Sequence, residues 1–195
     1  TNFPKKFRTK ETADLFLALI IKLLKEKGRC AIVLPDGTLF GEGMKTRLKE
    51  ELLERCNLHT IIRLPNGVFN PYTGIKTNLL FFEKGTATKD VWYFEHPYPK
   101  GAVSYNKTKP INIKEFDVEK TWWNNREDEK FSKNAWKVSI DEIKKRNYNL
   151  DIKNPHQEVD TLESPEVLLE KFRTTEQKIS TIQEEIMNVL TEALK

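Results

Sequence analysis

One stretch of the sequence, LPNGVFNPYTGIKTN at residues 64–78, combines aromatic, amide and cationic side chains within a short span. Aromatic rings stack on unpaired nucleobases, and amide groups form hydrogen bonds with the edges of those bases. The stretch therefore indicates contact with a base that has left the stack. An equally good interpretation is that Phe69 anchors the loop to the hydrophobic core. The side chains concerned are Phe69, Asn70, Tyr72, Thr73 and Lys76.

Few other patterns in the sequence suggest chemistry. There is no glycine-rich nucleotide loop, no Walker lysine loop and no cluster of carboxylates. The histidines and cysteines are scattered, which predicts no metal site. We interpret Cys30 and Cys56 as reduced residues of a cytoplasmic protein without a membrane-spanning segment. Asp36 follows an apolar run and is a candidate ligand, although a turn-forming role is commoner at such a position.

The net charge of +4 is unevenly distributed. Residues 163–195 carry 4 basic and 7 acidic side chains, which leaves residues 1–162 with a balance of +7. A basic body fits a polyanionic partner such as nucleic acid, but many solvated surfaces share this property. Charge alone therefore supports DNA as a partner only weakly.

Two apolar runs, each ended by Leu-Pro and a turn-forming pair, are predicted to be the strands that position this chemistry. The first covers residues 31–34 and the second residues 58–64. Amphipathic helices are predicted within residues 9–28 and over residues 42–55. A strand, a helix and a strand in this order form a parallel crossover, so we expect the two strands to be neighbours. Ligands bind at the carboxyl edge of such a sheet.

The run TNLLFFE at residues 77–83 predicts a further strand. The loop before it is too short to hold a crossover helix, so this strand must run antiparallel to a neighbour. DVWYFE at residues 90–95 predicts one more strand. The predicted fold class is therefore α/β, with a mixed sheet that has an antiparallel strand near its end.

Residues 96–162 show weak patterns and are predicted to form an irregular extension of a first domain at residues 1–95. A short helix capped by Ser139 is expected within this extension. Its tryptophans are interpreted as packing residues rather than as stacking platforms for bases. They are Trp122, Trp123 and Trp136.

A third region, residues 163–195, predicts one long helix that begins at Ser164-Pro165-Glu166. Its apolar residues recur in steps of four and three, which is the pattern of a heptad seam. At about 1.5 Å per residue, this helix is too long for one small domain to cover. We therefore predict that its seam docks on a partner subunit. The predicted docking residues are Leu168, Phe172, Ile179, Ile182 and Ile186.

Two stretches, DLFLALIIKLLKEKGRCAIVLPDGTLFGEG and IIRLPNGVFNPYTGIKTNLLFFEKG, strongly resemble the modification subunit of type I restriction-modification systems. Such subunits are S-adenosylmethionine-dependent DNA methyltransferases that act on adenine N6. The resemblance continues through SYNKTKPI, TWW, NAW and RNYNLDIKNPH, so it covers essentially the whole chain. It implies the carboxyl-terminal half of a Rossmann-like methyltransferase sheet, followed by a long helix.

The resemblance also implies which parts of the enzyme this chain lacks. In the family, a glycine-rich cofactor loop and an Asn/Asp-Pro-Pro-Phe/Tyr catalytic loop precede the segment that begins here at Thr1, and neither is in this sequence. We therefore expect a fragment that is inactive alone and holds no S-adenosylmethionine, which the full-length parent uses. By the resemblance, Phe69 lies near the flipped adenine, and the final helix packs on the specificity subunit.

The partners implied by the resemblance are DNA, the specificity and restriction subunits, and a second copy of the modification subunit. Two alternatives stay open. One is a non-catalytic assembly module that docks through residues 164–195, and the other is part of a different S-adenosylmethionine-dependent nucleic-acid methyltransferase. A catalytic loop encoded shortly before Thr1 would separate the first reading from these two.

Overall fold

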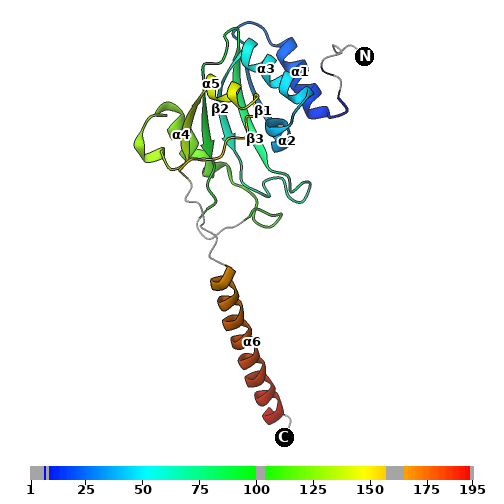
Figure 1. The fold of residues 1–195 in the computed structure, drawn as a ribbon, viewed down its shortest axis with the longest axis vertical. Coiled ribbons are helices and arrows are strands. Elements are labelled where there is room, and N and C mark those ends of the chain that lie inside the picture. The colour runs from blue at the N-terminus through cyan, green and yellow to red at the C-terminus, as the bar shows by residue number, and fades with distance from the viewer. Residues whose placement is uncertain (1–6, 8, 100–103, 157–164, 194–195) are drawn as a thin grey trace. The chain divides into compact units, whose positions relative to one another are not determined.

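The computed structural model describes residue 7 and residues 9–99, 104–156 and 165–193. The chain divides into two units, residues 1–157 and residues 158–195. The first unit is built on a five-stranded sheet, and the second contains one long helix (Figure 1). The strands are β1 (Arg29–Pro35), β2 (Cys56–Arg63), β3 (Thr77–Lys84), β4 (Asp90–Glu95) and β5 (Ala135–Ser139). The α-helices are α1 (Thr12–Leu23), α2 (Asp36–Phe40), α3 (Met44–Arg55), α4 (Asp117–Asn124), α5 (Ile140–Lys145) and α6 (Pro165–Ala193).

The sheet is mixed, as the sequence predicts, and its strand order is β1-β3-β2-β4-β5. β3 runs antiparallel to both β1 and β2. β4 runs parallel to β2, and β5 pairs antiparallel with β4. Leu80 of β3 lies opposite Ile32 of β1 and Ile61 of β2, so the backbone of β3 is paired on both sides.

The prediction that β1 and β2 are neighbours is wrong. Both strands point the same way, but β3 lies between them. After β2 the chain turns back through a loop, and β3 runs antiparallel alongside β2. β3 then pairs with β1 on its other side. The connections of a strand limit its direction, because a short loop demands an antiparallel return. They do not determine which strand fills the next place in the sheet.

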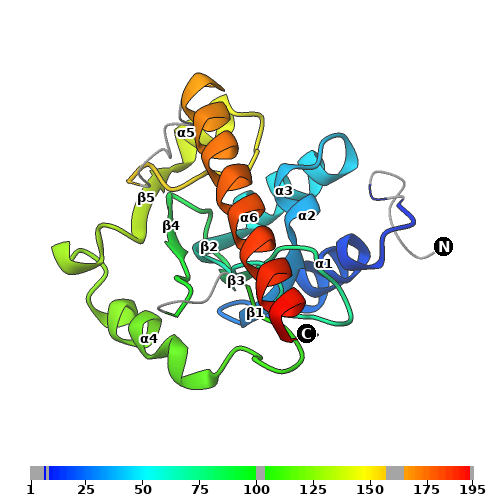
Figure 2. The same ribbon diagram turned by 90° about the horizontal axis from the view of Figure 1, so that it is seen from below.

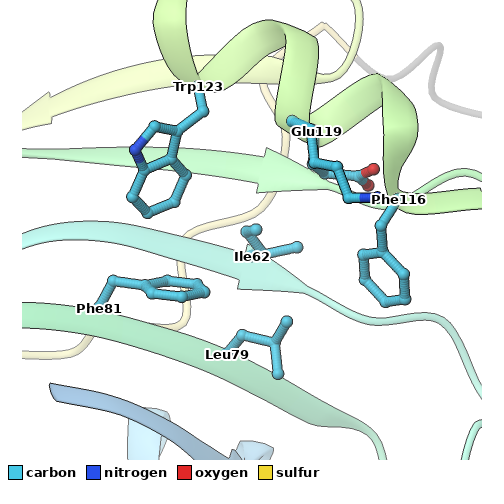
Figure 3. A pocket seen from close by; sticks show the side chains of 7 residues that line it. Ile62, Leu79, Phe81, Phe116, Glu119 and Trp123 are labelled. Atoms are coloured by element: carbon cyan, nitrogen blue, oxygen red, sulfur yellow. The ribbon is translucent and has the colours of Figure 1, made fainter. Parts of the chain in front are cut away.

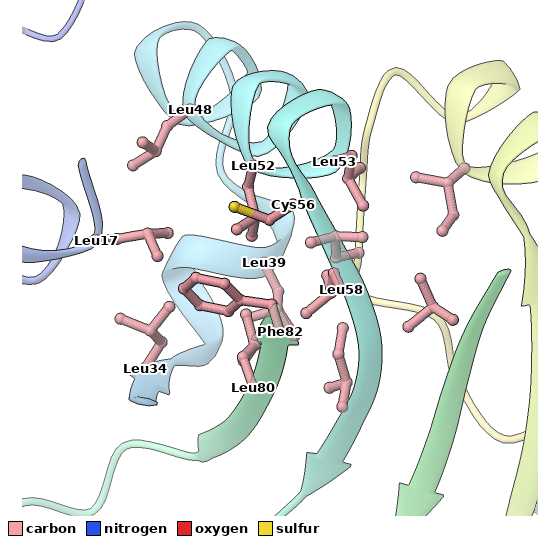
Figure 4. Packing of buried hydrophobic residues seen from close by; sticks show 14 of the residues in the cluster. Leu17, Leu34, Leu39, Leu48, Leu52, Leu53, Cys56, Leu58, Leu80 and Phe82 are labelled. Carbon is pink, nitrogen blue, oxygen red and sulfur yellow. The ribbon is translucent and has the colours of Figure 1, made fainter. Parts of the chain in front are cut away.

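Side chains of the strands enter two separate cores, one on each face of the sheet, because successive residues of a strand point to opposite faces. On one face, α1, α2 and α3 contribute leucines that pack against β1, β3 and β2 (Figure 4). Leu80 and Phe82 of β3 lie in this cluster with Leu48 and Leu52 of α3. Each fully buried leucine stabilises the fold by about 1.5–3 kcal/mol. This cluster is therefore the main core of the first unit.

The opposite face of the sheet carries α4 (Figure 2). The second core lies on this face and is rich in aromatic residues. Trp122 of α4 is fully buried, and the centroid of its ring lies 4.8 Å from that of Phe94 in β4. Trp123 meets Phe81 of β3 edge-on, with 4.9 Å between the ring centroids. Trp136 of β5 is also buried. Packing, the role predicted for these tryptophans, is the role that they have in the structure.

The prediction that residues 96–162 form an irregular extension is wrong for much of that segment. Two 3₁₀ helices, η2 (Ile113–Phe116) and η3 (Glu129–Phe131), accompany α4, β5 and α5 within it. β5 completes the sheet, so the segment belongs to the same unit as residues 1–95. Elements this short show too few periods to be recognised in a sequence. The expected helix after Ser139 is present, and the Ser139 hydroxyl accepts a hydrogen bond from the main-chain nitrogen of Glu142.

The second unit is described from Pro165, where α6 begins as predicted, and α6 is 29 residues long. Ser164 and the domain boundary predicted at residue 163 lie outside the described residues. The described side chains of α6 are all exposed, and these include the five predicted docking residues. The predicted apolar seam therefore exists as an accessible stripe along this helix.

Candidate functional site

β1 and β2 end at the same edge of the sheet, and β3 begins there because it runs the other way. The predicted base-contact loop, residues 64–76, connects β2 to β3 along this edge. Main-chain hydrogen bonds fasten both of its ends. Leu64 N donates to Thr77 O over 3.1 Å, and Asp36 N donates to Lys76 O over 3.0 Å. The loop is thus tied to the turn that follows β1 as well as to its own strands.

Polar contacts between side chains also hold this edge of the sheet together. Asn78 Nδ2 donates to Asp36 Oδ1 over 2.6 Å, and the guanidinium of Arg63 lies 4.0 Å from the second oxygen of Asp36. Arg63 also forms an ion pair with Asp151 at 2.6 Å and donates to the main-chain oxygen of Ile152 at 3.0 Å. These contacts hold together the ends of β1, β2 and β3 and the segment that follows α5. Asp36, a candidate ligand by sequence, is therefore engaged in the fold.

The loop is folded closely against the main chain of Tyr105. Asn70 Nδ2 donates to Tyr105 O over 3.0 Å. Gly67 lies so near the same oxygen that a β-carbon at its position would be 2.4 Å away, and its φ of 81° is one that side chains rarely adopt. Of the predicted base-contact residues, Asn70 thus uses its amide nitrogen to shape the loop.

The other predicted base-contact side chains are accessible to solvent. Tyr72 is 92 % exposed, Phe69 is 39 % exposed, and Lys76 is exposed as well. Val68 packs against the aromatic core beneath α4 and so anchors the loop. The sequence analysis gave Phe69 two possible roles, base contact and core anchor. In the structure Val68 anchors the loop, and the Phe69 ring is accessible to a ligand.

A buried lysine supports α2, the short helix that Asp36 begins. Lys49 of α3 is almost fully buried, and its ammonium group donates to Leu39 O at 2.6 Å and to Gly41 O at 2.9 Å. Burial, with a smaller contribution from the positive charge of Lys45, lowers the pKa of Lys49 to about 8. The last carbonyl groups of a helix have no main-chain donor within the helix. At the end of α2, the ammonium group of Lys49 takes the place of that donor. It therefore fixes the carboxyl end of α2.

An apolar hollow of about 360 Å³ lies between α4 and the strands β2 and β3 (Figure 3). Phe81, Phe116 and Trp123 supply aromatic walls, and Glu119 contributes a buried carboxylate. That carboxylate is hydrogen-bonded to Nδ1 of His96. The predicted base-contact side chains are not among the residues that line the hollow. It is therefore distinct from the loop site.

Arg63, Asn78 and Tyr105 are parts of the site that sequence reasoning missed. For two of them a signal was present, because Arg63 and Asn78 are polar residues next to apolar runs at strand ends. A polar side chain in a buried strand needs a hydrogen-bonding partner. Arg63 and Asn78 therefore each indicated that another polar group lies nearby. Tyr105 gave no such signal, since it meets the loop through its main chain.

The described residues do not fit S-adenosylmethionine. The carboxylate at the strand ends, Asp36, accepts a hydrogen bond from Asn78 and lies 4.0 Å from the guanidinium of Arg63, so it serves to hold the fold together. The sequence also has no G-x-G-x-x-G turn of the kind that approaches a cofactor between a strand and a helix. In the described ranges no group of three or more His, Cys, Asp or Glu side chains is placed to hold a metal ion. None of the described helices has the length and apolar character needed to cross a membrane.

Residues 2–164 match the model of the N-6 DNA methylase family. The EcoEI methylase subunit of Escherichia coli, from a type I restriction enzyme, is 56 % identical over 197 residues, with 99 % of this chain and 40 % of that protein covered. A crystal structure of a modification subunit assigned to a type I restriction enzyme of Vibrio vulnificus YJ016 has a TM-score of 0.75 at 47 % identity, over 83 % of this chain and 36 % of that one.

A further structure, from work on complex assembly in a type I restriction-modification system, has a TM-score of 0.75 at 36 % identity, over 98 % of this chain and 41 % of that one. The chain thus spans about 40 % of the length of the EcoEI subunit. The fold, the loop sequence and these similarities agree. The chain belongs to the N-6 DNA methylase family, and its resemblance to type I modification subunits is confirmed.

Proposed function

We propose that the whole protein to which this chain corresponds is the modification subunit of a type I restriction-modification system. It methylates adenine N6 in DNA with S-adenosylmethionine as methyl donor, and it acts in the cytoplasm. Family membership and the similarity to type I subunits support this proposal. Because the described residues do not fit the cofactor, its site is assigned to other parts of the protein.

The role proposed for the first unit is to form one wall of the pocket that receives the target adenine. An adenine inside a duplex cannot be reached by an enzyme until the base leaves the stack. The observation that carries the proposal is the loop at residues 64–76. It is fastened at both ends, yet it leaves the rings of Phe69 and Tyr72 accessible. A loop already fixed in place loses little conformational entropy when its rings stack on a base.

The charge of the same edge suits DNA. Lys76 is exposed in the same loop, and its ammonium group can contact a backbone phosphate while a ring holds the base. Arg63, although cationic, is engaged with Asp151 and Ile152 and is assigned to holding the edge. In this proposal, Phe69, Tyr72 and Lys76 touch DNA, and Asn70 fixes the loop that carries them.

The role proposed for α6 is assembly with the specificity subunit, and through it with the restriction subunit. Its exposed seam is the observation in favour, since apolar surface left in water is unfavourable by about 25 cal/mol per Å². The predicted docking residues are those of the seam. They are Leu168, Phe172, Ile179, Ile182 and Ile186.

Methyl transfer by the complete subunit, assembled with a specificity subunit, tests the proposed activity. S-adenosylmethionine with a tritiated methyl group is supplied with duplex DNA, and the DNA is then digested to nucleosides. The expected product is labelled N6-methyldeoxyadenosine. Label in cytosine or in RNA would assign the chain to another methyltransferase. Assembly without any label would leave the non-catalytic module as the function.

A further inference from the structure

A second loop, residues 104–114, lies against the base-contact loop at the same edge of the sheet (Figure 1). We call it the lysine loop. It follows β4, which runs parallel to β2, so the chain leaves both strands at one edge. The main-chain oxygen of Tyr105 accepts a hydrogen bond from the side chain of Asn70 over 3.0 Å. Because Asn70 is the neighbour of Phe69 in the chain, this contact brings the lysine loop close to the ring that is proposed to hold the base.

The charge of these two loops has one sign. The lysine loop carries Lys107, Lys109 and Lys114, the base-contact loop carries Lys76, and neither loop contains Asp or Glu. All four side chains are exposed. Together the two loops have a charge balance of +4, out of +7 for residues 1–162. More than half of the excess positive charge of these residues is therefore gathered at the edge where the base is proposed to enter.

The tip of the lysine loop is fixed by its own hydrogen bonds. Asn106 and Lys109 exchange two main-chain hydrogen bonds of 3.2 Å, which close a tight turn with Lys107 and Thr108 at its tip. The side-chain oxygen of Asn106 accepts three more bonds, from the main-chain nitrogen and the hydroxyl of Thr108 and from the main-chain nitrogen of Lys109. The turn thus presents its lysines from a defined main-chain position.

One carboxylate closes the base of the lysine loop. Glu115 accepts a hydrogen bond from the hydroxyl of the buried Tyr105, and another over 2.7 Å from the main-chain nitrogen of Asn112. Tyr105 therefore takes part in both loops, because its hydroxyl holds the lysine loop and its main-chain oxygen holds Asn70. A surface that is already assembled loses little conformational entropy when a ligand binds.

We propose that the lysine loop is a second DNA-contacting element, in which Lys107 and Lys109 bind backbone phosphates next to the flipped adenine. Base flipping rotates a nucleotide about its own backbone. Contacts to the neighbouring phosphates fix the strand in register while the base is out of the stack. This inference rests on the proposed methyltransferase function and adds to it a second loop and the class of contact that this loop makes.

Binding of a fluorescent DNA duplex by the complete modification subunit, assembled with a specificity subunit, tests the proposal over a range of salt concentrations. Lys107→Gln with Lys109→Gln removes two phosphate contacts. We expect affinity to fall about tenfold at about 0.1 M salt, and the slope of log K against log salt concentration to become shallower by about 1.8. The loss should be equal for DNA with and without the recognition site, since phosphate contacts carry no sequence information.

Two further pairs of substitutions serve as controls. Lys107→Arg with Lys109→Arg retains both charges and should bind like the parent. Lys25→Gln with Lys27→Gln removes two exposed lysines that have the same spacing in the chain. These lysines precede β1, so they lie at the opposite edge of the sheet, and their loss should leave affinity and salt slope unchanged.

The position of the contact is tested with duplexes in which uncharged methylphosphonates replace the phosphates that flank the methylated adenine. On this DNA the glutamine variant of Lys107 and Lys109 and the parent should bind about equally, because the partners of the two lysines are already absent. A difference as large as on unmodified DNA overturns the assignment to these phosphates.

An unchanged salt slope for the glutamine variant overturns the proposal, and so does an equal change for the control at Lys25 and Lys27. A loss of affinity that the arginine variant shares would assign the two lysines to the fold and overturn it as well. Failure of the glutamine variant to co-purify with the specificity subunit would assign them to a protein interface instead. Methylation by the parent is measured separately. A parent that transfers no methyl group to adenine refutes the proposed function, whereas the salt slope reports on the lysine loop.

Discussion

Arg63 donates a hydrogen bond from its guanidinium to the main-chain oxygen of Ile152, 89 residues further along the chain. The same group holds Asp151 in an ion pair and lies beside Asp36. Arg63 is the last residue of β2, and the base-contact loop starts immediately after it. One side chain thus joins the carboxyl edge of the sheet to the last described segment of the first unit.

Removal of this junction should destabilise the first unit. Arg63→Met leaves Asp151 and the Ile152 carbonyl without their donor, and we expect a loss of about 2 kcal/mol in the free energy of unfolding. Arg63→Lys retains the charge but not the two-pronged donor, so it should recover part of the loss. Urea denaturation of the chain measures both. Arg55→Met is the control, since the Arg55 side chain is 60 % exposed where it pairs with Glu51, and its loss should cost at most about 0.5 kcal/mol. Equal losses for Arg63→Met and Arg55→Met would contradict the assigned role.

Phe69→Ala in the complete enzyme should slow methylation and leave the fold intact. Stacking of an aromatic ring on a base contributes about 1–3 kcal/mol, which corresponds to a decrease in rate of about 5- to 150-fold. Phe69→Trp keeps an aromatic face and should retain most of the activity. Single-turnover methylation measures the rates, and thermal denaturation tests the fold. An unchanged rate for Phe69→Ala at matched stability would rule out the stacking role.

Assembly should depend on the seam of α6. Replacement of Ile179 and Ile186 by Asp places two charges in the seam, and we expect the complex with the specificity subunit to weaken by at least about 100-fold. The same number of charges added on the outer side, by Gln177→Asp with Thr191→Asp, should have little effect. A sizing column resolves complex from free subunits. If the seam variant still forms the complex at parental concentrations, docking uses another surface.

Lys49 should give the stability of the first unit a specific pH dependence. Its pKa of about 8 lies below the ordinary value of 10.5, so between these values the unfolded chain binds more protons than the folded chain. Stability contributed through Lys49 therefore rises with pH in this window. Relative to Lys49→Met, the parent should gain about 1 kcal/mol between pH 7 and pH 9.

The difference between parent and variant is the quantity to measure, by urea denaturation at each pH. Burial raises the pKa of Cys56 to about 11, so the thiol acts in the opposite direction and lowers the stability of both proteins as the pH rises above 9. Lys120→Met, at an exposed position, is the control for the loss of one lysine side chain. A flat difference between parent and Lys49→Met would show that Lys49 keeps its ordinary pKa.

The 195-residue chain alone should not bind S-adenosylmethionine tightly. Its edge carboxylate is engaged within the fold, and it has no G-x-G-x-x-G turn to approach a cofactor. Titration calorimetry with the purified chain should show no saturable heat at micromolar concentration. Saturable binding in that range would place the cofactor site within this chain.

The sequence by itself determined strands β1 to β4, helices α1, α3 and α6, and the antiparallel direction of β3. Each of these predictions came from a local pattern. The patterns were apolar runs ended by Leu-Pro, a loop too short for a crossover helix, and a heptad repeat of apolar residues. Such rules act between residues close in the chain, so they can be recognised in it. Phe69, Tyr72 and Lys76 were proposed as base-contact residues for the same reason, because the loop that carries them is one continuous segment.

Only the tertiary structure decided the order of the strands and the partners of the polar groups. β3 separates β1 from β2, and β5 joins the sheet from a segment with little periodicity. Asp36 is engaged by Asn78 and Arg63, and Val68 anchors the loop in place of Phe69. These outcomes depend on contacts between residues far apart in the chain. Several strands can fill one place in a sheet, and several polar groups can accept one buried hydrogen bond. Which of them does so depends on how the whole core packs.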